Sequence, residues 1–235
     1  MIKENRENYW MLNWLDKFME GHKGFICGGC FKNIFNNEKV KDLDIFFQNE
    51  GDREEAVDYF DSMTVGYTDG TTEDTVSEDE AKYKFLYEND NVKAYVHKET
   101  GIRLELISKI YGTAEQIVSQ FDFTITKFAY YKVEIEDETG EEVEKAHVSA
   151  GKENAKTHIE YKVMHDDKFF EHLHLKRLVI NDKIPYPMST FERMLRYAKY
   201  GYFPCRETKM LLIKALRELD DKQVELSESL YNGMD

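Results

Sequence analysis

Two acidic residues stand two positions apart in an apolar run, in the segment Asp42-Leu43-Asp44-Ile45. Side chains alternate faces along a β-strand, so both carboxylates would point the same way, about 6.6 Å apart along the chain. Two carboxylates on one face repel each other unless a cation lies between them, and oxygen-only ligands select hard ions such as Mg²⁺ or Mn²⁺. Such ions neutralise triphosphate oxygens and activate an attacking hydroxyl, so the pattern indicates phosphoryl transfer.

Paired glycines, Gly28-Gly29, follow the short apolar run 24–27, and twelve residues separate them from Asp42. Where a strand ends and a helix begins, glycines let backbone N–H groups approach a phosphate without interference from Cβ. Lys32 would lie on the first turn of that helix and add a positive charge. Each feature alone is typical of an ordinary turn or a solvated strand face, but together, at this spacing, they favour a nucleotide site.

The same turn contains a Cys-x-x-Cys motif, Cys27 to Cys30, which offers a redox or zinc interpretation. A helix N-terminus lowers the pKa of a thiol, as redox motifs require. A zinc site needs a second pair of ligands, and only Cys205 and scattered histidines remain. Neither interpretation explains the acidic pair, so we favour cysteines that are incidental neighbours of the glycines.

The run GGCFKNIFNNEKVKDLDIFF, residues 28–47, resembles the head-domain signature of bacterial poly(A) polymerases and CCA-adding tRNA nucleotidyltransferases. These enzymes belong to the DNA polymerase beta superfamily. The resemblance implies that Asp42 and Asp44 are catalytic metal ligands and that Gly28, Gly29 and Lys32 contact the triphosphate. Lys32 stands where the family has an arginine.

A second block, FDFTITKFAYY, is similar to the family strand that carries a third catalytic carboxylate, which would here be Asp122. Alternation of polar and apolar residues from Phe121 onward independently places Asp122 on the polar face of a predicted strand. Glu105, in the apolar run IRLELIS, competes for the same role. The sequence leaves the choice between Asp122 and Glu105 open.

The third block, RMLRYAKYGY, resembles the family helix whose basic residues contact the incoming nucleotide. Arg193 and Arg196 match two arginines of that helix, and Lys199 falls at a third basic position. Thr190 replaces an aspartate that helps the family to read the base. The identity of the nucleotide therefore does not follow from the resemblance.

The whole chain of 235 residues predicts an α+β fold, with a mixed β-sheet nucleotidyltransferase head flanked by helices and a small C-terminal helical unit. We place the catalytic domain at 1–183, with an acidic hairpin insertion near 132–149, and a neck-like helical unit with an acidic tail at 184–235. We also expect a strand to begin at Phe121. A capping box, Ser189 to Glu192, should open the helix that carries the basic residues.

The net charge of −14 argues against a protein that coats nucleic acid non-specifically. The charge is uneven, because residues 161–219 hold 12 Lys and Arg against 7 Asp and Glu. A polyanionic ligand should therefore bind mainly to that region. The apolar runs are too short to span a membrane, and three cysteines do not make a disulfide scaffold, so a cytoplasmic protein is expected.

These observations predict an enzyme that moves a nucleoside monophosphate from an NTP to a hydroxyl acceptor, with Mg²⁺ or Mn²⁺ as cofactor. We expect the acceptor to be an RNA 3′ end such as that of tRNA, because the positive region would hold it. One alternative is a toxin-like or antibiotic-directed nucleotidyltransferase that modifies a protein or a small molecule. The other is a non-catalytic nucleotide-binding module. The oligomeric state does not follow from the sequence.

Overall fold

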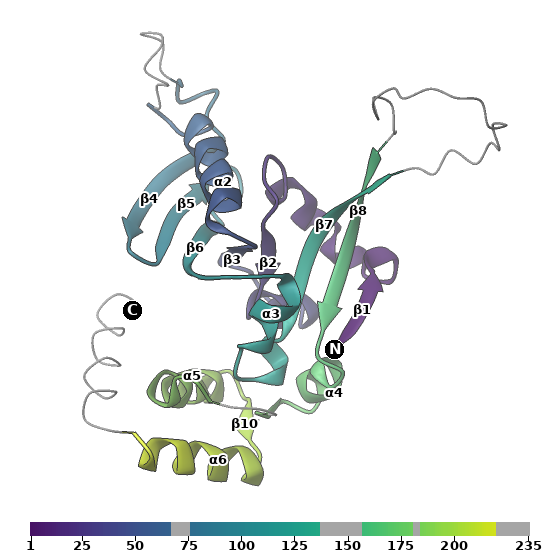
Figure 1. The fold of residues 1–235 in the computed structure, drawn as a ribbon, viewed down its shortest axis with the longest axis vertical. Coiled ribbons are helices and arrows are strands. Elements are labelled where there is room, and N and C mark those ends of the chain that lie inside the picture. The colour runs from purple at the N-terminus through teal and green to yellow at the C-terminus, as the bar shows by residue number, and fades with distance from the viewer. Residues whose placement is uncertain (67–75, 137–156, 181–183, 220–235) are drawn as a thin grey trace, which may run out of the picture.

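One eight-stranded mixed sheet organises the molecule, in the strand order β1-β8-β7-β2-β3-β6-β5-β4 (Figure 1). The computed structural model describes residues 1–66, 76–136, 157–180 and 184–219. The strands of the sheet are β1 (Ile2–Asn5), β2 (Phe25–Cys27), β3 (Asp42–Phe47), β4 (Tyr83–Asn89), β5 (Val92–His97), β6 (Arg103–Tyr111), β7 (Phe128–Glu136) and β8 (Thr157–His165). This arrangement confirms the predicted α+β class with a mixed sheet.

Helices lie against both faces of the sheet and beyond one end of it (Figure 1). The α-helices are α1 (Cys30–Phe35), α2 (Glu50–Ser62), α3 (Ala114–Ser119), α4 (Phe169–His174), α5 (Pro187–Lys199) and α6 (Arg206–Arg217). Three short 3₁₀ segments are η1 (Arg6–Asn8), η2 (Trp10–Phe18) and η3 (Thr124–Thr126), and a two-stranded sheet joins β9 (Arg177–Leu178) to β10 (Phe203–Pro204).

Strand β3 lies near the centre of the sheet, antiparallel to β2 and parallel to β6. Its apolar residues Leu43, Ile45 and Phe47 are fully buried in the main core, against η2, α1 and α2. The alternating residues Asp42 and Asp44 therefore point to the opposite face. The strand position that the sequence predicts for the acidic pair is confirmed.

A smaller apolar cluster covers part of that opposite face. Helix α3 contributes Ala114, Ile117 and Val118, which pack on Cys27 and Phe46 of the sheet. The capping box of Thr113 and Gln116 satisfies backbone N–H groups at the start of α3. The acidic pair thus lies on a partly covered face, beside an apolar layer.

The C-terminal helices pack against each other, and Figure 1 shows them beyond the end of the sheet. Tyr202 connects them to the head: it is fully buried, and its hydroxyl accepts hydrogen bonds from Asn36 Nδ2 at 2.7 Å and Lys176 Nζ at 3.0 Å. The division of the chain at residue 184 stays a prediction. The predicted acidic tail at 220–235 and residues 137–149 of the predicted hairpin lie outside the described residues.

Two local predictions are wrong. Helix α5 begins at Pro187, whose fixed φ suits the first turn, and Ser189 does not cap it because its hydroxyl accepts from Arg193 instead. The expected strand at Phe121 is replaced by the 3₁₀ turn η3. Its start is fixed by the amide of Thr124, which donates to Val179 O at 3.0 Å.

Among the described residues, we find no helix that combines the length and the apolar character needed to cross a membrane.

His22 is buried at the turn that leads into β2, and its ring is held in one neutral form. The amide of Gly24 donates to Nδ1 at 3.0 Å, so the ring proton lies on Nε2, which donates to Phe18 O at 2.8 Å. Burial lowers the pKa of His22 to about 4. A charged imidazolium would lose the Gly24 bond and would be poorly solvated.

This burial predicts an acid-dependent loss of stability. As the pH falls below 6.5, the ordinary pKa of histidine, His22 is protonated in the unfolded chain. In the folded protein it stays neutral until about pH 4. Wild-type protein should lose about 3 kcal/mol more than His22→Gln across that window. Urea unfolding of both proteins at several pH values measures the difference. Equal losses on acidification would contradict the assignment.

Candidate active site

The acidic pair is joined by a third carboxylate on the neighbouring parallel strand. The register places Asp44 of β3 directly opposite Glu105 of β6 and Cys27 of β2. Burial raises the pKa of Asp44 to about 8, and the negative charges of Glu105 and Asp42 add to the effect. The backbone therefore forces together carboxylates that would separate if they were free.

Arg103 offsets part of this negative charge. Its Nε lies 2.7 Å from Glu105 Oε1, an ion pair that lacks the angle of a hydrogen bond, and a terminal nitrogen lies 4.0 Å from Asp42 Oδ2. Tyr87 donates to the same Glu105 oxygen at 3.2 Å. Asp42 is exposed and Arg103 is half-buried, so this compensation is weakened by solvent.

The donor set fits a hard divalent cation. Within the described ranges, no cluster of three or more His, Cys, Asp or Glu side chains is already arranged as a metal site. Asp42 and Asp44 nevertheless supply carboxylate oxygens only, on one face of a strand, with Glu105 opposite. Mg²⁺ typically takes one or two protein carboxylates and completes its shell with water and substrate phosphates.

Asp122 lies on the segment before η3 and is paired with a helix of the C-terminal unit. It is 5% exposed, and its Oδ2 accepts from Arg193 Nε at 2.8 Å, with a terminal nitrogen of Arg193 at 2.7 Å. The other oxygen accepts from the amide of Phe123 at 2.8 Å. Arg193 also donates to Ser189 Oγ at 2.9 Å. This arginine thus neutralises the carboxylate that the family resemblance assigns to a metal.

The paired glycines lie beside Asp44. Gly28 has a φ of +98°, and a Cβ there would lie 3.5 Å from Asp44 Oδ2, so the turn brings backbone against the carboxylate. The amide of Gly28 donates to Phe128 O at 3.1 Å and is already satisfied. A Cβ on Gly29 would lie 3.1 Å from the hydroxyl of Tyr197 on α5.

Of the remaining predicted contacts, Lys32 is buried and engaged elsewhere. Its Nζ lies 2.7 Å from Glu38 Oε2 and faces the rings of Tyr200 and Tyr202 at 5.2 and 5.8 Å. Arg196 and Lys199 are exposed on α5. The structure thus gathers Asp42, Asp44 and the glycines at one place, while Lys32 holds the helical unit in this conformation.

The two cysteines of the motif are both buried, and burial raises the pKa of each thiol well above its ordinary value. The charge of nearby Asp44 acts in the same direction. A thiolate is the reactive form of cysteine, so this environment disfavours redox chemistry. The motif is better explained by packing beside the glycine turn.

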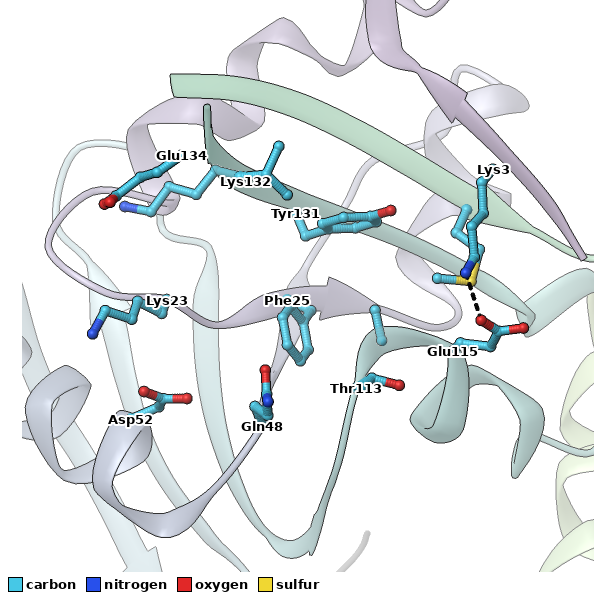
Figure 2. Close-up of a pocket in the computed structure, with 13 residues that line it drawn as sticks. Lys3, Lys23, Phe25, Gln48, Asp52, Thr113, Glu115, Tyr131, Lys132 and Glu134 are labelled. Atoms are coloured by element: carbon cyan, nitrogen blue, oxygen red, sulfur yellow. Dashed lines mark ion pairs between the residues drawn. The ribbon is translucent and has the colours of Figure 1, made fainter. Parts of the chain in front are cut away.

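A separate hollow of about 500 Å³ lies further along the sheet, next to α3 (Figure 2). Phe25, Tyr131 and Met164 line it, and the ion pair of Lys3 with Glu115, at 2.6 Å, closes one side. None of the three carboxylates on β3 and β6 lines this hollow. The candidate site is therefore defined by charge and turn geometry rather than by this cavity.

Sequence reasoning missed two residues of the site. Arg103 stands two positions before Glu105 on β6, and strand alternation would have placed both on one face. Tyr197 follows Arg193 by one helical turn, and the i, i+4 spacing puts both side chains on the same side of α5. The spacing of Arg193 and Tyr197 is visible in the sequence, but an aromatic residue in a helix more often belongs to the hydrophobic core.

The fold is similar to that of the head of CCA-adding enzymes. A CCA-adding enzyme solved with CTP superposes with a TM-score of 0.53 at 13% identity, covering 97% of this chain and 49% of that one. One solved with ATP gives 0.54 at 14%, covering 93% and 46%. The chain thus spans about half the length of these enzymes, and the similarity concerns the fold.

Residues 5–176 match the sequence profile of the Gabija anti-defense 2 family (Gad2). That match covers well over half of the chain, so the chain belongs to this family. No curated protein matches it by sequence.

The strain on Asp44 predicts that removing its charge stabilises the metal-free protein. For a carboxyl group whose folded pKa is raised, the penalty grows as the pH rises from its ordinary value of 3.8 towards 8. With a chelator present at about pH 7.5, the free energy of unfolding of Asp44→Asn should therefore exceed that of wild type by about 1–3 kcal/mol. At about pH 4 the two proteins should be almost equally stable. Denaturant unfolding measures this, and a destabilised Asp44→Asn at the higher pH would contradict it.

The ion pair of Asp122 and Arg193 predicts strong coupling between the two residues. Asp122→Asn and Arg193→Gln should each cost about 1–3 kcal/mol, since either change leaves a poorly solvated partner. The double variant should cost little more than one single variant. Unfolding free energies of the four proteins form the test. Additive losses would show that the two side chains act independently.

Proposed function

We propose that the chain transfers a nucleoside monophosphate from an NTP to a hydroxyl acceptor and releases pyrophosphate. The observation that carries this proposal is the placement of Asp42 and Asp44 on one face of β3, with Glu105 opposite on β6. The similarity of the fold to that of CCA-adding enzymes also supports it. In this fold the glycine turn lies beside Asp44.

Asp42 and Asp44 would hold Mg²⁺ or Mn²⁺, and the bound ion would neutralise phosphate oxygens and activate the acceptor hydroxyl. The third carboxylate is Glu105 or Asp122. The register supports Glu105, which faces Asp44 directly, whereas Asp122 is neutralised by Arg193. Asp122 would join the metal site only after that pair separates.

The nucleotide would lie against Gly28 and Gly29, next to Asp44. Arg196 and Lys199 are exposed on α5 and free to offset triphosphate charge. Lys32 and Arg193 remain candidates for the same task, but each would first have to leave an ion partner, Glu38 or Asp122.

For the acceptor, an RNA 3′ end remains the first candidate, because the positive charge gathers after residue 160. Family membership favours a second candidate, a macromolecule of the Gabija defence, since the family is described by its action against that defence. The chain's half-length relative to the CCA-adding enzymes is the reason not to assign tRNA.

The test incubates the purified protein with each α-labelled NTP, Mg²⁺ and either total RNA or lysate from cells that carry the Gabija defence. Label in RNA supports the first acceptor, and label in protein supports the second. Label in a small molecule would exclude both. If no NTP gives transfer to any fraction, the chain is a nucleotide-binding module or has another function.

We expect substitutions of the carboxylates to reduce the rate of transfer to different extents. Asp42→Asn and Asp44→Asn should each reduce transfer about a thousandfold, because a catalytic metal contributes several kcal/mol. Glu105→Gln should approach that loss, whereas Asp122→Asn should lose less. Initial rates of label transfer measure all four. A fully active Asp44→Asn would refute the proposed site, and an inactive Asp122→Asn beside an active Glu105→Gln would reverse the third assignment.

A further inference from the structure

Tyr197 presents a hydroxyl to the candidate site from the helical unit. Its ring is fixed by edge contacts with Phe123 and Tyr202, at centroid distances of 5.9 and 6.2 Å. Its hydroxyl lies 3.1 Å from the point where a Cβ on Gly29 would stand. Packing of the ring therefore aims the hydroxyl at the glycine turn.

This hydroxyl has no hydrogen-bond partner in the part of the chain that the structure describes. Tyr197 is only half-buried, and its hydroxyl is not an enclosed, unsatisfied atom. By contrast, the hydroxyl of Tyr202, beyond the end of α5, accepts from both Asn36 and Lys176. A fixed hydroxyl that solvent reaches and that no described side chain uses is suited to a ligand.

The charges around Tyr197 define what kind of ligand group it meets. Burial and the nearby carboxylates of Asp122 and Asp44 raise the pKa of the phenol, so the hydroxyl keeps its proton. It is therefore a hydrogen-bond donor at neutral pH. Arg193 and Arg196 also act on it electrostatically, which adds positive charge at the same place.

We propose that the Tyr197 hydroxyl donates a hydrogen bond to a phosphate oxygen of the nucleotide that binds between Gly29 and Asp44. Tyr197 is then a positioning residue supplied by the helical unit, and it fixes the triphosphate chain relative to the carboxylates. This inference rests on the proposed nucleotidyl transfer. It explains why position 29 is glycine, since an alanine would push against the hydroxyl although φ at this residue, −69°, suits any residue.

The experiment measures binding of NTP, of NMP and of inorganic tripolyphosphate, each with Mg²⁺, to wild type, Tyr197→Phe and Gly29→Ala. Phenylalanine keeps the ring packing and removes only the hydroxyl. Tyr197→Phe should weaken the binding of NTP and of tripolyphosphate about tenfold, which corresponds to one hydrogen bond to a charged group. In the transfer assay, KM should change more than kcat. Gly29→Ala should weaken the binding of both ligands in the same direction.

Tyr200→Phe is the matched control, because Tyr200 lies on the same helix end with an exposed side chain, and it should bind as wild type does. Unchanged affinity in Tyr197→Phe would overturn the proposal. A loss confined to nucleotides, with tripolyphosphate unaffected, would also overturn it, since the hydroxyl would then contact the nucleoside. If wild type binds no NTP at all, the proposed function itself fails, which is a distinct result.

Discussion

Mutual repulsion between carboxylates is the constraint on which the rest of this molecule depends. Asp42 and Asp44 share a face of β3 because their apolar neighbours are buried on the other face, and parallel pairing with β6 adds Glu105 opposite Asp44. The protein offsets only part of this charge, through the half-buried Arg103. In the proposed function these carboxylates hold a cation, and the glycine turn lies beside Asp44.

The helical unit takes part in this electrostatic arrangement. Helix α5 inserts Arg193 against Asp122 and Tyr197 against Gly29, while Tyr200 and Tyr202 face Lys32. These contacts join the helical unit to the head beside the candidate site.

Much of this could be predicted from the sequence, and the exceptions have physical causes. The α+β class and the face of Asp44 follow from local alternation of polar and apolar residues. The partners of Lys32 and Asp122 do not, because Arg193 lies 71 residues from Asp122 and only the tertiary fold joins them. The capping box predicted at Ser189 fails for the same reason: its hydroxyl accepts from Arg193, and Pro187 starts the helix instead. The proposed preference for Glu105 over Asp122 rests on the register of β3 and β6, two strands that are distant in sequence.

The most direct test of the central claim is anomalous scattering from crystals of the protein grown with Mn²⁺ and a non-hydrolysable NTP analogue. We expect a manganese peak between the carboxylates of Asp42 and Asp44, with the phosphates of the analogue against Gly28 and Gly29. Crystals of Asp44→Asn should lack that peak. Manganese absent from β3 in the wild type, or the analogue bound in the hollow beside α3, would contradict the account.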